Sequence, residues 1–529
     1  MARNWWKERV VYQIYPRSFC DSNGDGIGDI QGIIQKLDVL KELGIGILWL
    51  SPVYRSPNRD NGYDISDYCE INPEFGTMED MDELIEKAKR LDIKLVMDLV
   101  INHTSFEHEW FQRSRKREEP YTDYYIWKDK PNNWTGFFGG TTWTYDEQRK
   151  QYYLHLFDEG QPDLNYNNPK VLQSVKAVMR FWLDKGVSGF RCDVINVLYK
   201  SSLKNGFPSP ALCGREHYIS KKGTLKILHE LRRDVLSEYD CFTVGETVMV
   251  KPRQARKLCT DALDMVFAFE HMETDCFFIK WFLRKFKPER LFRALLKWQK
   301  KMPWNAVYFE NHDQPRSVSR FGDDKNFHKE SAKALAVLLL TLKGTPYVYQ
   351  GEEIGMTNFD YESMDEIRDV ESKNVYEIAK RFRFSEEYRW RMIRLKSRDN
   401  ARTPMQWNAQ ENAGFSSGEP WLKVNKNHGS INFESEYNDP DSVWHFYKKL
   451  IEFRNGSEVL KRGSFRLSYL SPDVFAFERA YDGKKLGVIV NLSGKKKKVP
   501  CVGFTVLSTH GRAQIDCELE PYEAAILRR

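Results

Sequence analysis

Apolar residues along the chain alternate between short β-rich runs and longer stretches with helical spacing. The short runs predict strands at residues 10–15, 45–50, 94–99, 189–194, 242–245, 265–269, 306–309 and 346–349. Stretches with apolar residues three and four positions apart predict helices at residues 33–43, 81–91, 171–185 and 224–238. Because strands that alternate with helices form βα units around a parallel sheet, this pattern predicts an α/β fold, a TIM (β/α)8 barrel.

Two stretches interrupt this rhythm. Residues 104–168 show no obvious crossover helix and are rich in aromatic residues and glycine, which is typical of an insertion at the barrel mouth. After residue 455 the pattern changes to short alternating strands, which indicates a small all-β domain. We therefore predict a barrel from residues 1–103 and 169–455, an inserted domain at 104–168 and a C-terminal β-sandwich at 456–529.

The composition is that of an ordinary globular protein, with 41% hydrophobic and 29% charged residues among 529. The net charge of +6 is small for this length, and the single basic run at residues 495–498 is too narrow for a nucleic-acid surface. No signal peptide and no membrane span is visible, and nine cysteines without a C-x-x-C pair predict free thiols. We expect a cytoplasmic monomer or weak homo-oligomer with no nucleic-acid or membrane partner.

Titratable residues stand at the carboxyl ends of predicted strands, where the loops of a barrel form its active site. Asp98, Asp193, Glu246 and Asp313 all occupy such positions. Paired carboxylates suit acetal hydrolysis, which needs one ionised carboxylate and one protonated acid. Arg191 lies on the same strand face as Asp193 and is expected to lower the pKa of Asp193, which favours a nucleophile. Glu246 has no basic neighbour in sequence, which favours the acid.

Four ordered motifs resemble the signature regions of the α-amylase family, glycoside hydrolase family 13. They are VINHT (100–104), GFRCD (189–193), VGET (244–247) and ENHDQ (310–314). QPDLN (161–165) resembles a further signature of the oligo-1,6-glucosidase branch, and the resemblance covers nearly the whole chain. It implies a barrel with an inserted domain B after strand three and a C-terminal all-β domain.

The resemblance implies a role for each matching residue. Asp193 would be the nucleophile, Glu246 the acid/base, and Asp313 a third carboxylate that holds the distorted sugar. The implied substrate-binding residues are Asp60, Tyr63, His103, Arg191, Val194, His312 and Arg398. Among them, Asp60 and Arg398 would grip the non-reducing end and so permit exo attack only.

Val194, directly after the predicted nucleophile, resembles the branch members that act on α-1,6 bonds. The resemblance therefore implies a retaining α-glucosidase that releases glucose from short α-1,6-linked oligosaccharides. An α-1,4-glucosidase stays open as an alternative, because a β-branched residue can simply end a strand. The chain also departs from its relatives at Cys192 and Glu310, and both departures leave substrate detail open.

Two other activities of the family also remain open. Sucrose isomerases, which transfer glucose, carry an Arg-rich loop after strand seven, whereas residues 319–324 are poor in Arg. A trehalose-6-phosphate hydrolase would need a phosphate site, for which Lys200, Lys204 and residues 221–222 are candidates. A non-catalytic relative is disfavoured because all three carboxylates are kept and no membrane span is visible.

An early loop carries oxygen side chains at alternate positions and resembles the first half of a calcium loop. The expected ligands are Asp21, Asn23, Asp25, Ile27 and Asp29. The twelfth position is Gly32 instead of a bidentate Glu, so the loop is not an EF-hand. We expect a structural Ca²⁺ and no cofactor for catalysis, with a metal-free turn as the alternative.

Overall fold

A computed structural model describes residues 4–528, apart from the side chains of Cys501 and Val502. Its central feature is an eight-stranded parallel sheet in the order β11-β10-β9-β5-β2-β1-β15-β14. The strands are β1 (Val11–Ile14), β2 (Ile47–Leu50), β5 (Lys94–Leu99), β9 (Gly189–Cys192), β10 (Phe242–Glu246), β11 (Met265–Phe267), β14 (Ala306–Val307) and β15 (Thr345–Tyr349). The end strands β11 and β14 lie against each other, so the sheet forms a nearly closed barrel. The predicted fold class is confirmed.

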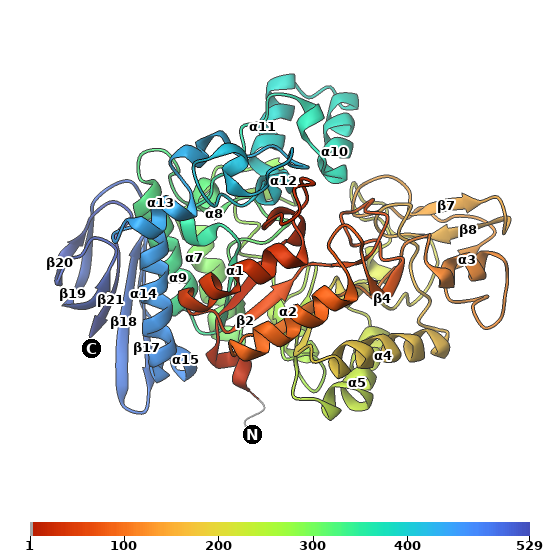
Figure 1. Cartoon of the computed structure of the whole chain (residues 1–529), viewed down its shortest axis with the longest axis horizontal. Helices are drawn as coiled ribbons and strands as arrows, with labels where there is room; N and C mark the ends of the chain where they lie inside the picture. Colours follow the sequence, from red (N-terminus) through yellow and green to blue (C-terminus); the bar gives the residue numbers. More distant parts are fainter. Residues whose placement is uncertain (1–3, 529) are drawn as a thin grey trace.

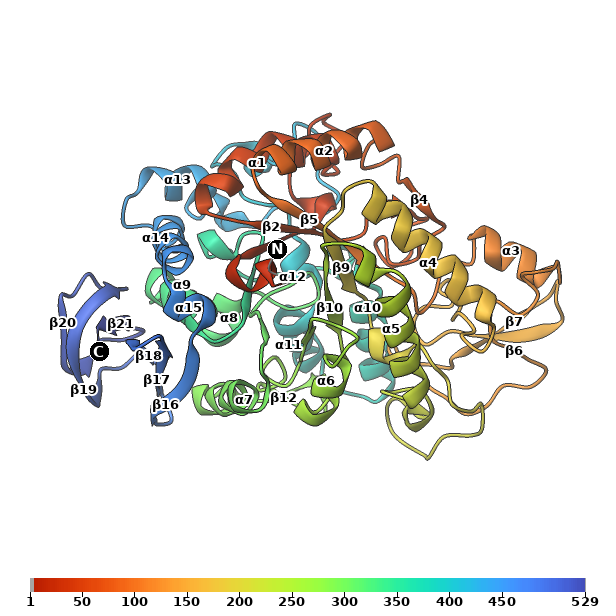
Figure 2. The ribbon, with the colours of Figure 1, turned by 90° about the horizontal axis from the view of Figure 1, so that it is seen from below.

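Helices surround this barrel (Figures 1 and 2). They include α1 (Ile30–Leu43), α2 (Met78–Arg90), α4 (Pro169–Asp184), α5 (Lys222–Asp234), α6 (Pro252–Leu258), α7 (Pro288–Lys301), α8 (Ser317–Phe321), α9 (His328–Thr341), α13 (Phe433–Asn438), α14 (Val443–Gly456) and α15 (Glu458–Arg462). The four predicted helices are present, and each begins two or three residues before its predicted start. In α1 and α2 the start is set by a side-chain cap, Asp29 and Thr77 respectively, which lies ahead of the regular apolar spacing.

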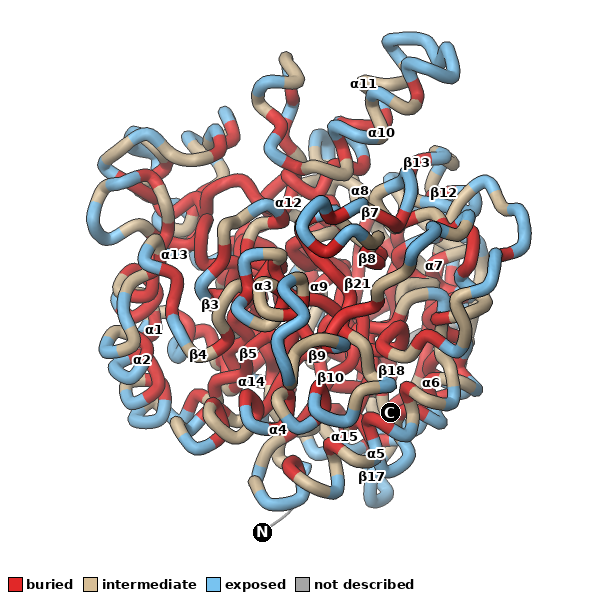
Figure 3. Tube along the Cα trace, turned by 90° about the vertical axis from the view of Figure 1, so that its right-hand side faces the viewer, coloured by how far each residue is buried: buried red, intermediate tan, exposed pale blue. Residues whose placement is uncertain are grey.

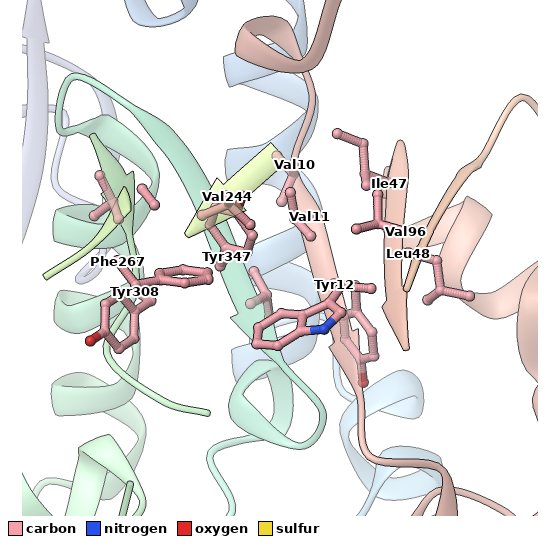
Figure 4. Close-up of a cluster of buried hydrophobic side chains, with 14 of the residues drawn as sticks. Val10, Val11, Tyr12, Ile47, Leu48, Val96, Val244, Phe267, Tyr308 and Tyr347 are labelled. Atoms are coloured by element: carbon pink, nitrogen blue, oxygen red, sulfur yellow. The ribbon is translucent and has the colours of Figure 1, made fainter. Parts of the chain in front are cut away.

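The barrel interior is filled by apolar and aromatic side chains (Figure 4). Phe267 of β11 meets Tyr308, just after β14, at 5.0 Å between ring centroids, and Tyr347 of β15 at 4.7 Å. Both contacts have the edge-to-face geometry that aromatic rings favour. These rings close the barrel where β11 and β14 meet, so the interior is a packed core and the chemistry lies at the strand ends.

The segment between β5 and β9 forms the expected insertion, seen at one end of the molecule in Figures 1 and 2. It contains a short helix, α3 (Glu109–Arg115), and a three-stranded antiparallel sheet of β6 (Trp127–Lys128), β7 (Trp143–Asp146) and β8 (Gln151–Leu154). Aromatic residues such as Phe111, Tyr125 and Tyr153 give it a small core of its own. Many of the aromatic residues in this stretch therefore form the core of the insertion.

The C-terminal strands form one antiparallel sheet where a β-sandwich was expected. They are β16 (Ser464–Leu470), β17 (Val474–Tyr481), β18 (Lys484–Asn491), β19 (Lys497–Ser508), β20 (Gln514–Leu519) and β21 (Ala524–Arg528), in the order β16-β17-β18-β21-β19-β20. Phe475 and Phe477 join the main core, whereas Ile489 packs with Ile515 and Leu519 in a second cluster. The sheet therefore curls over its own outer face, which buries both faces without a second sheet.

A pair of helices, α10 (Val370–Arg381) and α11 (Glu386–Lys396), projects from the barrel (Figures 1 and 3). A hairpin of β12 (Cys276–Phe277) and β13 (Ile279–Leu283) packs against it through Trp281 and Ile393. The short helix α12 (Asp399–Arg402) follows and returns the chain to the barrel. A second small hairpin, β3 (Tyr54–Arg55) and β4 (Asp67–Ile71), encloses the loop that carries Asp60 and Tyr63. In the described part of the chain, no helix is long and apolar enough to span a bilayer.

Candidate active site

Arg191 joins three carboxylates at the carboxyl ends of neighbouring strands. One end of its guanidinium, Nη1, lies 2.5 Å from Asp98 Oδ1 and 2.6 Å from Asp193 Oδ1, and the other end donates to Glu246 Oε2. Asp98 belongs to β5, Asp193 follows β9 and Glu246 ends β10, so three adjacent strands supply the cluster. Asp193 and Glu246 are thereby held close together around one cation, as the sequence predicted.

Arg191 acts on the pKa of Asp193 in the expected direction, but burial outweighs its effect. Burial raises the pKa of Asp193 well above its usual range; Arg191 opposes the rise, whereas Glu246 and Asp98 add to it. Arg191 also gives Glu246 the basic neighbour that the local sequence lacks. The guanidinium contacts both carboxylates and therefore does not distinguish them. Their division into nucleophile and acid stays a prediction.

Asp313 occupies a different electrostatic environment. Its Oδ1 lies 2.8 Å from Arg402 Nη2 and 3.4 Å from Arg398 Nη1, and its Oδ2 lies 3.1 Å from His312 Nε2. Although burial favours the neutral acid, His312, Arg398 and Arg402 hold the pKa of Asp313 well below its usual range. Asp313 is therefore ionised and suited to accept hydrogen bonds from sugar hydroxyls.

Arg398 and Asp60 meet at the far end of the site. Arg398 Nη2 lies 3.2 Å from Asp60 Oδ1, and Gln161 Nε2 donates to Asp60 Oδ2 at 3.2 Å. The same Gln161 nitrogen lies 3.2 Å from Nε2 of His103. Burial lowers the pKa of His103 to about 4, so its ring is neutral near pH 7. The structure thus brings the predicted Asp60, Arg398 and His103 to one connected cluster.

Tyr63 and His312 form the aromatic part of the site. Their rings stack at 5.2 Å with an interplanar angle of 7°, and the Tyr63 hydroxyl donates to Asp98 Oδ2 at 3.3 Å. Gln13 of β1 holds the imidazole from its other nitrogen, because Gln13 Nε2 lies 2.8 Å from His312 Nδ1. Both predicted side chains are therefore rigidly placed beside the carboxylate cluster.

Val194 has an unusual backbone. Its φ is +35°, a left-handed conformation that is strained for a β-branched residue. This explains why β9 ends at Cys192, two residues earlier than predicted. The Val194 N–H donates to Glu246 Oε2 at 3.3 Å, and the side chain belongs to a buried cluster that includes Leu156 and Tyr218. Val194 therefore links the predicted acid to the wall that the insertion contributes.

Sequence reasoning missed two residues that contact the site directly. Arg402 binds Asp313, and its position one helical turn after Arg398 was the available signal. Asp369, before α10, contacts Arg398 Nη2 at 2.8 Å and had no local signal, because the contact depends on how α10 docks. Asp98 was noted at a strand end without a role, and it completes the contacts of Arg191.

The predicted calcium loop folds around the carboxylate of Asp21. Its Oδ1 accepts the backbone N–H groups of Asn23 and Gly24, its Oδ2 accepts that of Gly26, and Asp29 caps α1. Across residues 4–528, no group of three or more His, Cys, Asp or Glu side chains is arranged to hold a metal ion. Asp21 and Asp29 are satisfied without a cation, so the loop geometry gives the expected Ca²⁺ no direct support, and the ion stays a prediction.

Two adjacent carboxylates bridged by a guanidinium, with a third held ionised at the same mouth of a (β/α)8 barrel, define a glycoside hydrolase. Residues 13–463 match the model of the alpha amylase catalytic domain, and the chain belongs to the α-amylase family.

Comparisons with individual proteins agree with this family. The chain is 50% identical to an oligo-1,6-glucosidase of Bacillus cereus, over 94% of this chain and 92% of that protein. A solved isomaltulose synthase of Klebsiella sp. LX3 superposes with a TM-score of 0.94 at 40% identity, with 99% of each chain covered. A solved trehalose-6-phosphate hydrolase of Bacillus licheniformis superposes with a TM-score of 0.91 at 42% identity, over 99% of this chain and 100% of that one. The chain is thus similar to proteins with three different activities.

Proposed function

We propose that this glycoside hydrolase is a retaining, exo-acting α-glucosidase that releases glucose from the non-reducing end of short α-1,6-linked oligosaccharides. The observation that carries the exo mode is the closed end of the site, where Arg398 bonds both Asp60 and Asp313. A terminal glucose can contact these groups through its hydroxyls, but a chain cannot pass between them. The substrate is a small oligosaccharide, as for the oligo-1,6-glucosidase to which the chain is similar.

The proposed chemistry uses the carboxylate pair in two steps. In the first step, Asp193 attacks the anomeric carbon as the ionised nucleophile while Glu246, as the acid, protonates the leaving oxygen. Glu246 then removes a proton from water, and the water oxygen attacks the anomeric carbon and displaces the Asp193 carboxylate, which gives glucose with its original α configuration. Asp313, kept ionised by its cationic neighbours, accepts hydrogen bonds from the sugar as the ring distorts.

Linkage preference is assigned to the neighbourhood of Val194. Its backbone N–H contacts the predicted acid/base, and its side chain belongs to a buried cluster that includes Leu156 of the insertion, so Val194 borders the acceptor side of the proposed site. The name of the Bacillus cereus relative supports the α-1,6 linkage. An α-1,4-glucosidase is the second candidate, because it would use the same carboxylates.

The other two candidates find less support in the described residues. Lys200, a predicted phosphate contact, is 5% exposed and lies 2.5 Å from Asp163, so it is already neutralised. In the segment after strand seven, Arg320 is bound to Asp275 at 2.7 Å and therefore does not supply a free cation for isomerisation. Both observations favour hydrolysis of an unphosphorylated glucoside.

Assays with isomaltose, maltose, sucrose and trehalose 6-phosphate in parallel test the proposal. We expect the highest kcat/KM with isomaltose, and glucose that appears first as the α-anomer by NMR. Faster cleavage of maltose would support the α-1,4 alternative. Initial β-glucose would contradict retention. Isomaltulose or trehalulose from sucrose would support the transferase candidate.

The cellular setting is also part of the proposal. The eight cysteines whose side chains the structure describes are all free, which suits a reducing compartment. We therefore assign the protein to the cytoplasm, acting as a monomer or weak homo-oligomer without a nucleic-acid partner. Size-exclusion chromatography with light scattering tests the oligomeric state.

A further inference from the structure

Asp369 is a buried carboxylate that lies behind the predicted sugar-binding residue Arg398. It is 0% exposed and is the residue that caps the N-terminus of α10. Its Oδ1 accepts Arg398 Nε at 2.8 Å and also lies 2.8 Å from Arg398 Nη2. Its Oδ2 accepts the Ser372 hydroxyl at 2.5 Å. One carboxylate therefore holds both the guanidinium and the start of the helix.

The contact with Asp369 is the shortest of the acidic contacts to Arg398. The distances to Asp60 and Asp313 are 3.2 Å and 3.4 Å. Asp313 keeps 26% of its side chain exposed, whereas the side chain of Asp369 is fully buried. Asp369 therefore does not face the sugar, and it can influence binding only through Arg398.

The link between the two segments is reciprocal. Asp399, the residue after Arg398, accepts the backbone N–H groups of Arg368 and Asp369 at 2.7 and 2.8 Å. The guanidinium of Arg398 also lies 5.0 Å from the ring of Phe138 in the insertion. Asp369 and Phe138 thus contact the guanidinium while the bonds of Asp399 fix the adjoining backbone, an arrangement that keeps a long side chain in one rotamer.

We propose that Asp369 is a positioning residue that orients Arg398 toward the 4-hydroxyl of the terminal glucose. C4 is the ring carbon opposite the anomeric carbon, so its hydroxyl reaches the closed end of the site. Without the charge of Asp369, the guanidinium would be drawn toward Asp60 and Asp313 and would compete with that hydroxyl for them. This inference rests on the glucose recognition in the proposed function, not on its linkage preference.

The test compares wild type with Asp369→Asn. Asn is as good a helix N-cap as Asp, so this change removes the charge and keeps the cap of α10. The substrates are p-nitrophenyl α-glucoside and its 4-deoxy analogue, which need no particular linkage. We expect KM for the glucoside to rise about tenfold, as for loss of one charge-assisted hydrogen bond, with kcat changed less than about threefold. KM for the 4-deoxy analogue should stay unchanged.

If Asp369 had a merely structural role, Asp369→Asn would raise KM for both substrates by the same factor. That result would overturn the inference. Ser372→Ala is the matched control: it removes the contact to the other oxygen of Asp369 and should lower Tm without changing the KM ratio. In an Arg398→Lys background, Asp369→Asn should have little further effect, and a full additional loss would contradict action through Arg398. If Asp369→Asn does not fold, Asp369→Ser keeps a capping oxygen and serves in its place.

Failure of the proposed function would look different. A wild type that does not hydrolyse the aryl glucoside would contradict the proposed function alone. Calorimetric binding of glucose and 4-deoxyglucose to wild type and variant then gives the same comparison without turnover. Equal discrimination between these two sugars in both proteins would refute the role of Asp369.

Discussion

Arg398 and Arg402 lie one helical turn apart and approach the same oxygen of Asp313, at 3.4 and 2.8 Å. Arg402 also donates from Nε to the backbone carbonyl of His312 at 2.9 Å, so it fixes the loop as well as the carboxylate. The two cations have different further partners. Arg398 extends to Asp60, whereas Arg402 is 1% exposed and contacts the loop of Asp313.

Arg402→Lys should impair catalysis more than substrate binding. Lysine keeps the charge but cannot bond Asp313 and the His312 carbonyl together, so the loop loses its fixed geometry. We expect kcat/KM to fall about a hundredfold, mostly through kcat, as for loss of one strong buried hydrogen bond in the transition state. Steady-state kinetics with a thermal melt checks this, and unchanged kcat in a folded variant would contradict it.

Asp193→Asn and Glu246→Gln should separate the roles that Arg191 leaves undistinguished. Loss of the nucleophile should reduce kcat by about 10⁴-fold or more for every glucoside. Loss of the acid should reduce it by roughly 10³-fold for isomaltose. p-Nitrophenyl α-glucoside needs little protonation to leave, so its bond cleavage should be much less affected by Glu246→Gln. The opposite pattern would exchange the two assignments.

Asp60 should make stability depend on pH. Burial raises its pKa to about 6, against the charges of Arg398 and Arg402. A carboxyl with a raised folded-state pKa stabilises the fold fully below its ordinary value of 3.8, and that contribution is lost as pH rises through about 6. Between about pH 4 and pH 6 the free energy of unfolding of wild type should fall, relative to Asp60→Asn, by up to about 3 kcal/mol.

Urea unfolding of wild type and Asp60→Asn at several pH values from 4 to 7 measures this difference. Asn mimics the neutral acid and does not titrate, so the variant gives the reference at each pH. A difference that stays constant over the whole range would show that Asp60 has no raised pKa.

Val194→Thr should change linkage preference without removing activity. The substitution keeps the β-branch, so the left-handed backbone is strained to the same degree, but it places a hydroxyl on the acceptor side of Glu246. We expect the ratio of kcat/KM for isomaltose to that for maltose to fall about tenfold, about 1.4 kcal/mol of relative transition-state binding. An unchanged ratio would exclude Val194 as the determinant.

Removal of calcium should affect stability and not chemistry. If the loop of Asp21 holds the expected ion, EDTA should lower Tm by several degrees and Ca²⁺ should restore it. Asp21→Ala should abolish this response, while kcat/KM at 25 °C stays close to that of wild type. A Tm that does not respond to EDTA or to added Ca²⁺ would mean that Asp21 and Asp29 serve only the backbone.

The barrel could be predicted because each of its elements has a strong local pattern. Buried parallel strands have short, continuous apolar sequences, and their carboxyl ends lie at the same face of a barrel. Asp98, Asp193 and Glu246 could therefore be assigned to one site from the sequence alone. Helix starts were displaced by two or three residues because capping residues such as Asp29 and Thr77 set the start, and they lie ahead of the regular apolar spacing.

The remaining features depend on contacts that the local sequence does not encode. Burial decides the direction of the Asp193 pKa, and burial exists only in the fold. The left-handed Val194 contradicts the preference of β-branched residues for extended backbone. The contact of Asp369 with Arg398 requires α10 to dock beside α12, and the curl of the C-terminal sheet requires packing partners from distant strands.

The place of β1 between β2 and β15 has a consequence for synthesis of the chain. Val11 pairs with Ile47 soon after both emerge, but its other partner, Tyr347, is made hundreds of residues later. At typical translation rates this leaves one edge of β1 unpaired for about tens of seconds. An open, apolar edge of this kind invites pairing with other nascent chains. Production of this enzyme should therefore be sensitive to elongation rate and to chaperones that cover strand edges.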